Sequence, residues 1–186
     1  VIGINGNFDD AQTSVKNLFT DKELVEEMAE NGMQFSSANS INIGRLTPQI
    51  VYYVYAYTRL LARGVIREND PVNFVVPTGN FGNILAAYYA GRMGLPIGKL
   101  ICASNSNKVL FDFFTTGEYD RNRKFVLTSS PSMDILISSN LERLIYHICG
   151  DNAAECAEFM KDLKEKGKYR ITPEMRARLG VFVSGY

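Results

Sequence analysis

Two glycines and two asparagines lie in a short turn between a β-branched run, 72–76, and a helical pattern, 81–93. The turn consists of Gly79, Asn80, Phe81, Gly82 and Asn83. A strand-to-helix turn gathers unpaired backbone N–H groups at the positive end of the helix dipole, where anions bind. Glycine lets a phosphate approach the main chain, and asparagine can donate further hydrogen bonds. These residue types predict a site for a phosphate group.

A simpler interpretation of the turn stays open. The two glycines can serve only to permit a tight connection, with Asn80 capping the helix that follows. The turn matches neither of the two common nucleotide signatures, because no Gly-Lys-Ser/Thr follows it and its glycines are not spaced as GxGxxG. The local sequence alone does not decide between the two interpretations.

The elements that must position this turn alternate between short β-branched runs and longer helical periods. We expect strands near 1–5, 72–76, 99–103 and 124–128. We expect helices near 9–19, 21–31, 50–61, 81–93, 107–117, 140–148 and 153–166, and a short one after Pro173. Such alternation is typical of an α/β fold with parallel strands and crossover helices.

Length and composition limit the possible classes of protein. The 186 residues are enough for one domain, and 46% hydrophobic and 22% charged residues are typical of a globular chain. Twenty basic residues balance twenty acidic ones, so nothing predicts nucleic acid or a membrane as a partner. No apolar run is long enough to cross a bilayer, and the three cysteines lack zinc-site spacing. We therefore expect a cytoplasmic location.

Two further residues have less specific interpretations. His147, the only histidine, lies in an apolar helical pattern, so we expect a structural role for it. Cys102 lies in an expected strand and is predicted to be a small core residue.

Four longer stretches, read together with the turn, resemble the threonine synthase family. They are 3–19, 37–57, 75–120 and 129–148. This family belongs to the tryptophan-synthase-β-like, fold type II enzymes that use pyridoxal phosphate. The resemblance implies a three-layer αβα fold with a mainly parallel sheet, of which this chain holds a truncated part.

The resemblance also implies roles for individual residues. Gly79 to Asn83 would hold the phosphate of pyridoxal phosphate, and three residues would bind substrate, namely Ser40, Asn42 and Arg45. A planar, always-charged guanidinium suits a carboxylate or phosphate of the substrate, although a surface position explains Arg45 as well. Helix capping is the alternative for Ser40 and Asn42. The segment 129–135 has no assigned role.

In this family the enzyme converts O-phosphohomoserine and water into threonine and phosphate, as a carbon–oxygen lyase of threonine biosynthesis. The reaction needs a Schiff-base lysine, and we find no segment resembling its surroundings. We therefore expect residues 1–186 to be a single piece of the larger cofactor-binding domain, cut at both ends and inactive alone. The lysine segment would lie upstream, and a C-terminal segment would follow Tyr186. The alternative is a non-catalytic protein on the same scaffold that binds a phosphate ligand or serves as an interaction protein. The sequence does not address oligomeric state.

Overall fold

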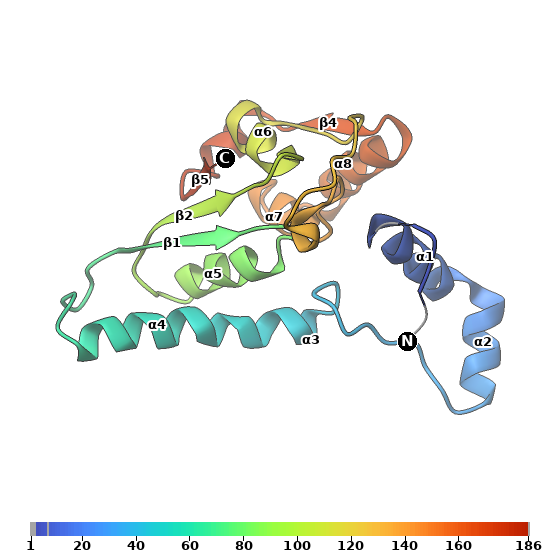
Figure 1. Cartoon of the computed structure of the whole chain (residues 1–186), viewed down its shortest axis with the longest axis horizontal. Helices are drawn as coiled ribbons and strands as arrows, with labels where there is room; N and C mark the ends of the chain where they lie inside the picture. Colours follow the sequence, from blue (N-terminus) through green and yellow to red (C-terminus); the bar gives the residue numbers. More distant parts are fainter. Residues whose placement is uncertain (1–2, 7, 186) are drawn as a thin grey trace.

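The computed structural model describes residues 3–6 and 8–185, and its centre is a parallel sheet (Figure 1). Three strands lie in the order β1 (Val72–Pro77), β2 (Ile97–Ala103) and β5 (Phe182–Gly185). Both neighbouring pairs are parallel. Parallel neighbours require crossover connections, and these are supplied by helices, as the alternating sequence pattern predicts.

Helices cover one face of this sheet. α4 (Ile50–Ala62) and α5 (Gly82–Arg92) run beneath β1 and β2 in Figure 1. Side chains alternate along the strands, so Val76 and Leu100 are buried under the helices, whereas Val75 and Val183 on the opposite face are exposed. The predicted α/β class with a parallel sheet is confirmed. The expected three-layer fold has helices on both faces of the sheet. Within residues 3–6 and 8–185, helices cover one of these two faces.

The long helix α4 continues a short helical lead-in. α3 (Ile43–Leu46) is followed by the 3₁₀ turn η1 (Thr47–Gln49), which contains Pro48. Proline has no N–H to donate and disfavours the helical conformation in the residue before it, so a change of helix type at this point is expected. The predicted helix over 50–61 is confirmed.

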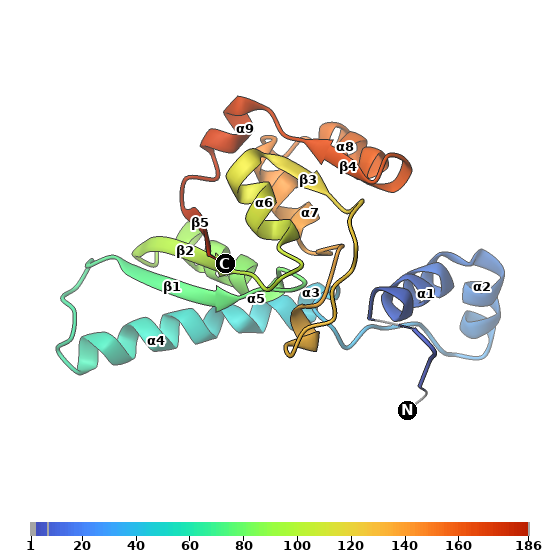
Figure 2. The same cartoon turned by 45° about the horizontal axis from the view of Figure 1, so that its top comes forward.

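Two N-terminal helices lie to one side of the sheet (Figures 1 and 2). They are α1 (Phe8–Thr20) and α2 (Lys22–Glu30). Asp21 caps α2, because its carboxylate accepts from the Leu24 amide at 3.2 Å. Ser139 Oγ donates to Gln12 Oε1 at 2.7 Å and so connects α1 to the rest of the chain. Both predicted helices are confirmed.

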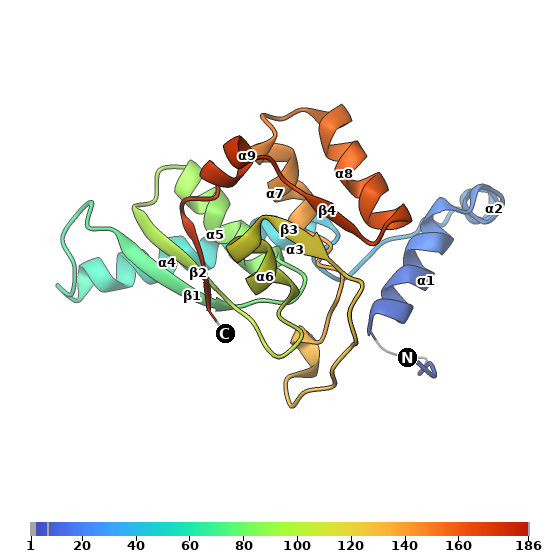
Figure 3. The same cartoon turned by 90° about the horizontal axis from the view of Figure 1, so that it is seen from above.

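The remaining elements form a second group beside the sheet (Figures 2 and 3), and Phe114 of this group stacks on Phe182 of β5. Its helices are α6 (Val109–Thr116), α7 (Leu141–Ile148), α8 (Ala153–Glu165) and α9 (Pro173–Ala177), with a 3₁₀ turn η2 (Pro131–Met133). An antiparallel pair, β3 (Glu118–Asp120) and β4 (Lys168–Arg170), packs beside them. The rings of Phe113, Tyr119 and Tyr169 contact one another in the core of this group.

Two of the expected strands are wrong. Residues 3–5 form no strand and Ile4 is exposed, while residues 1 and 2 lie outside the described part. Residues 124–128 form an extended loop held by side chains: Asn107 Oδ1 accepts from the Val126 amide at 2.9 Å, and its Nδ2 donates to the Val126 carbonyl at 2.8 Å. Because a side chain satisfies this backbone, the segment needs no neighbouring strand. The third strand of the sheet is β5 instead.

Candidate functional site

The glycine turn connects β1, which ends at Pro77, to α5, which begins at Gly82. Phe81 precedes the helix with φ of 64°, in the left-handed region that non-glycine residues rarely adopt. Its ring is 1% exposed and lies against the rings of Phe114 and Phe182. Burial of the ring offsets the backbone cost, so the core itself fixes the sharp entry into α5.

The amides of the turn have no hydrogen-bond partner in the part of the chain that the structure describes. Just before the turn, the Thr78 amide donates to the Ala103 carbonyl, and just after it the Leu85 amide donates to the Phe81 carbonyl. No hydrogen bond among the described residues uses the amide of any residue from Gly79 to Asn83. These amides border a pocket of about 200 Å³, which is lined by the turn and by Ser40, Gln49, Pro77 and Thr78.

Neighbouring segments explain why glycine is needed at two positions. A Cβ on Gly79 would lie 2.8 Å from the Ser132 carbonyl oxygen, and a Cβ on Gly82 would lie 2.6 Å from Cβ of Ser40. Real Cβ atoms essentially never make such short contacts. The sequence assigned no role to the segment 129–135. In the structure, this segment packs directly against the turn at Gly79.

Two side chains hold the carbonyl groups of the turn. Ser138 Oγ donates to the Gly79 carbonyl at 2.8 Å, and Asn140 Nδ2 donates to the Asn80 carbonyl at 2.9 Å. The Asn140 amide also donates to the Asn80 carbonyl, at 3.1 Å. In a trans peptide the C=O and the following N–H point in opposite directions. Fixing these carbonyls on one side therefore directs the next two amides, of Asn80 and Phe81, to the other side.

The two asparagines of the turn have different environments. Tyr53 OH donates to Asn83 Oδ1 at 2.5 Å and to its carbonyl at 3.0 Å, which fixes Asn83 at the start of α5. Burial raises the pKa of Tyr53, so this hydroxyl stays protonated as a donor. Asn80 Oδ1, in contrast, is buried without a hydrogen-bond partner among the described residues. A buried polar atom without a partner is uncommon, and it marks Asn80 as a position that a ligand can satisfy.

The three residues predicted to bind substrate lie in different environments. Ser40 lines the pocket and accepts from Asn140 Nδ2 at 3.0 Å. The Asn42 side chain caps α3, accepting from the Gly44 amide at 2.9 Å and donating to the Ser37 carbonyl at 3.0 Å. Arg45 is exposed on α3 and does not line this pocket. The structure thus brings only Ser40 to the turn.

Sequence reasoning missed four residues of the site. Gln49 lines the pocket, Tyr53 holds Asn83, and Ser138 and Asn140 hold the carbonyls of the turn. The sequence identified Asn140 only as the start of a helix. Its contacts with the turn span 60 residues of sequence, and no local pattern could reveal them.

A buried carboxylate organises the loops behind the turn. Asp134 accepts from the Thr128 amide at 2.8 Å, from Thr128 Oγ1 at 2.7 Å and from Asn105 Nδ2 at 2.6 Å. Asn107 Nδ2 adds a fourth bond at 3.2 Å. Burial alone would raise the pKa of the Asp134 carboxyl, but these hydrogen bonds outweigh burial and lower it. The ionised group therefore connects the loop after β2 to the segment around Ser132.

The other reactive side chains lie elsewhere. Lys99 is exposed, and its Nζ donates to the Gly180 carbonyl at 2.9 Å. Cys102 is buried in the core as predicted, and burial raises the pKa of its thiol to about 11. The described residues contain no group of three or more His, Cys, Asp or Glu side chains arranged to hold a metal. Among the same residues, no helix is both long enough and apolar enough to span a bilayer.

Known proteins resemble this chain over most of its length. No protein-family model matches the chain. "Threonine synthase-like 1" from Homo sapiens is 46% identical over 180 residues, which cover 96% of this chain and 24% of the human protein. "Threonine synthase" from Pseudomonas aeruginosa is 42% identical over 170 residues, covering 91% of this chain and 34% of that protein. The chain thus spans between about a quarter and a third of these relatives.

A solved structure matches over nearly the whole chain. The crystal structure of PLP-bound threonine synthase from Brucella melitensis has a TM-score of 0.81 and 42% identity, and the match covers 98% of this chain and 37% of that one. This match and the parallel sheet place the chain in the fold type II class of pyridoxal-phosphate enzymes. Within that class, the chain belongs to the threonine synthase family.

Proposed function

We propose that this chain is the phosphate-binding central part of a pyridoxal-phosphate-dependent threonine synthase. The complete enzyme would convert O-phosphohomoserine and water into threonine and phosphate, as a cytoplasmic carbon–oxygen lyase of threonine biosynthesis. One observation carries the proposal: the amides from Gly79 to Asn83 have no hydrogen-bond partner among the described residues and border a pocket of about 200 Å³ at the start of α5.

The residues present fit the phosphate of the cofactor. Unpaired amides at a helix start donate hydrogen bonds to a phosphate and stabilise its negative charge without requiring a lysine. Asn80 contributes a buried side-chain atom without a partner among the described residues. Its side-chain oxygen and nitrogen are assigned by hydrogen bonding and can exchange places, so the same position can donate to a phosphate.

Bound pyridoxal phosphate would supply an electron sink for carbanions formed on the substrate. The role of this chain would be to hold that group in one orientation. The turn would bind the phosphate, while Ser138, Asn140 and Tyr53 keep the turn rigid. A fixed geometry of this kind lowers the entropic cost of reaching the reactive arrangement.

Substrate binding by this chain is the second part of the proposal. The Ser40 hydroxyl accepts one bond from Asn140 and has its own proton available for a ligand in the pocket. Arg45 forms no ion pair with the described residues, so its guanidinium is available for the carboxylate or phosphate of O-phosphohomoserine. Asn42 keeps its predicted role only if the cap of α3 opens, because its amide already makes two bonds.

A binding assay tests the phosphate site directly. Pyridoxine 5′-phosphate lacks the aldehyde and cannot form a Schiff base, so its affinity measures noncovalent binding alone. Pyridoxine lacks the phosphate as well. In the protein that carries this chain, we expect the phosphate ester to bind about 100-fold more tightly than pyridoxine, measured by calorimetry. Equal affinities would refute the phosphate site.

A charge-changing variant identifies the residues. Asn80→Asp keeps the size of the side chain and adds a negative charge at the turn. The charge would repel phosphate, so we expect pyridoxine 5′-phosphate to bind at least about tenfold more weakly. Asn17→Asp makes the same change on the exposed surface of α1 and should leave the affinity unchanged.

A second candidate is a protein that binds a phosphate ligand on this scaffold without catalysis. The relatives with the higher identities are named "Threonine synthase-like 1" rather than "Threonine synthase". Release of inorganic phosphate from O-phosphohomoserine by the protein that carries this chain separates the two. Phosphate release supports the synthase, and tight cofactor binding without release supports the second candidate.

A further inference from the structure

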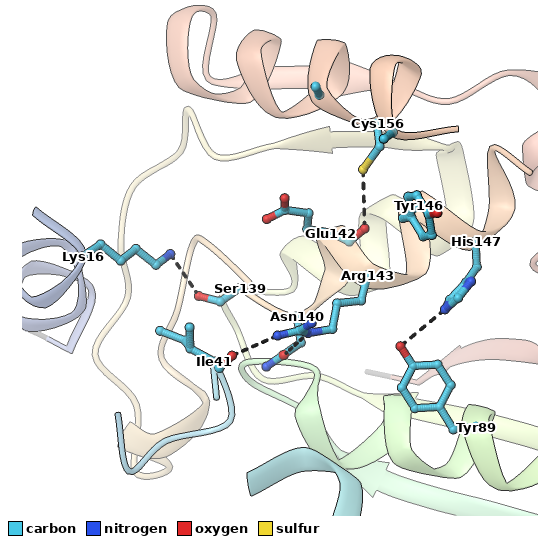
Figure 4. A pocket seen from close by; sticks show the side chains of 12 residues that line it. Lys16, Ile41, Tyr89, Ser139, Asn140, Glu142, Arg143, Tyr146, His147 and Cys156 are labelled. Carbon is cyan, nitrogen blue, oxygen red and sulfur yellow. Dashed lines mark hydrogen bonds between the residues drawn. The ribbon is translucent and has the colours of Figure 1, made fainter. Parts of the chain in front are cut away.

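A larger pocket, of about 580 Å³, is lined in part by Asn140, the residue whose side chain donates to the Asn80 carbonyl of the turn (Figure 4). Its walls come from α1, α5, α7 and α8, from the loop before α7, and from Ile41 in the segment before α3. None of the residues from Gly79 to Asn83 lines it, so the pocket is separate from the proposed phosphate site. Its volume lies in the range of small-molecule binding sites.

Three charged side chains line this pocket, and none of them forms an ion pair with the described residues. They are Lys16, Glu142 and Arg143. Within the described part of the chain, Lys16 Nζ donates to Ser139 Oγ alone, at 3.3 Å. Arg143 donates from Nε to Asn140 Oδ1 at 3.2 Å and from Nη2 to a main-chain carbonyl at 2.9 Å, both uncharged acceptors. Two cations and one carboxylate therefore border the same cavity without neutralising one another.

Aromatic side chains line the other part of the pocket. In Figure 4, Tyr89, Tyr146 and His147 lie toward the side opposite Lys16. His147 Nδ1 is 2.8 Å from Asp151 Oδ1 and its Nε2 is 3.3 Å from Tyr89 OH, so both ring nitrogens have partners. This agrees with the structural role expected for His147. The histidine shapes an apolar wall and leaves the charges of the pocket to the other three residues.

We propose that this pocket binds an α-amino acid with an aromatic side chain, in its zwitterionic form. The carboxylate would contact Arg143 and Lys16, since a guanidinium is suited to pair with a carboxylate. The ammonium group would contact Glu142. The aromatic side chain would pack against Tyr89 and Tyr146, where ring pairs add to the burial of apolar area.

Other classes of ligand fit the charges less well. A phosphate ester would bring about two negative charges next to the unpaired carboxylate of Glu142. A simple amine would face the two cations, Lys16 and Arg143. An uncharged apolar ligand would pair with none of the three charged groups, and covering any of them would be costly. A zwitterion offers a partner to each of the three.

Calorimetry with three matched probes tests the class of ligand. L-phenylalanine carries both charges, 3-phenylpropionate lacks the ammonium group, and 2-phenylethylamine lacks the carboxylate. With the full chain and no cofactor present, we expect L-phenylalanine to bind at least about tenfold more tightly than either analogue. Binding of 3-phenylpropionate or 2-phenylethylamine as tight as that of L-phenylalanine overturns the proposal, as does no binding of L-phenylalanine at millimolar concentration.

Two variants test the location. Glu142→Gln and Lys16→Gln each remove one charge outside the glycine turn. Each should weaken the binding of L-phenylalanine by about tenfold or more. Glu158→Gln and Lys22→Gln are matched controls outside the pocket and should have no effect. Unchanged affinity in both pocket variants overturns the assignment. Because these variants leave pyridoxine 5′-phosphate binding intact, failure here is distinguishable from failure of the phosphate site.

Discussion

Asn140 is the residue on which the geometry of the turn depends most. It is 1% exposed, donates to the Asn80 carbonyl and Ser40 Oγ, and accepts from Arg143 Nε. We expect Asn140→Ala to lower the free energy of unfolding by about 1–3 kcal/mol, because Ser40 Oγ and Arg143 Nε lose their partner while the Asn80 carbonyl keeps only the bond from the main-chain amide. Urea unfolding measures this loss, and Asn17→Ala on the surface of α1 is the control. A loss below about 0.5 kcal/mol would show that the contact is not structural.

Asp134 gives the fold a specific dependence on pH. Its folded pKa lies below the ordinary value, so its contribution to stability is complete above the unfolded pKa of about 4 and is lost as pH falls through the folded pKa. Asp134→Asn removes the ionised acceptor of four hydrogen bonds. We expect the variant to be less stable by about 2–3 kcal/mol at pH 7 and the difference to shrink below about pH 4. Urea midpoints across this range decide; a constant difference would contradict the assignment.

At the scale of the element, the junction of β1 and α5 depends on the left-handed conformation of Phe81. Phe81→Ala should lower the free energy of unfolding by about 3–5 kcal/mol, because the buried ring is lost. Phe81→Gly loses the same ring but adopts positive φ without the penalty of a Cβ. We therefore expect Phe81→Gly to be more stable than Phe81→Ala by about 1 kcal/mol in thermal unfolding. The reverse order would show that the backbone is not left-handed at this residue.

Helices were predictable from the sequence because their periodicity and caps are local. The apolar spacing of α4 and the cap of α2 both depend on residues that are close together in the sequence. The prediction of a strand over 124–128 was wrong because the same β-branched pattern also suits an extended loop. The side chains of Asn107 and Asp134 accept from the main-chain amides of this loop. β5 was missed since it is short and rests on its pairing with β2, about 80 residues earlier.

The candidate site divides in the same way. The turn was predictable because its glycines and asparagines are consecutive, and backbone amides require no distant partner. The supporting residues, such as Ser138 and Tyr53, reach the turn only through tertiary packing. Arg45 shows the opposite case, since its suitability for an anion is local while its exposed position on α3 is set by the fold.

At the scale of the whole molecule, one face of the parallel sheet exposes apolar side chains. Val75 is 65% exposed and Val183 is 41% exposed, while the helices pack on the other face. A parallel sheet is ordinarily covered on both faces. The 186 residues correspond to 37% of the matched threonine synthase from Brucella melitensis, so the chain alone holds only part of the surfaces such an enzyme can use.

Because the chain corresponds to only part of the matched enzyme, we make a prediction about its activity alone. The proposed chemistry needs an amine that reaches the bound cofactor, and no lysine lines the pocket at the turn among the described residues. Lys16 lies at the other pocket, and Lys99 donates to the Gly180 carbonyl at the surface. We therefore expect the 186-residue chain alone to release no phosphate from O-phosphohomoserine.

Two measurements on the isolated chain check this expectation. A colorimetric phosphate assay should stay at background, and added pyridoxal phosphate should not produce the near-visible absorbance band of a lysine-linked cofactor. Pyridoxine 5′-phosphate should still bind, because the turn does not need the amine. Phosphate release above background that survives Lys16→Gln and Lys99→Gln would mean that another group of this chain performs the step assigned to the lysine, and the proposed division of roles would then be wrong.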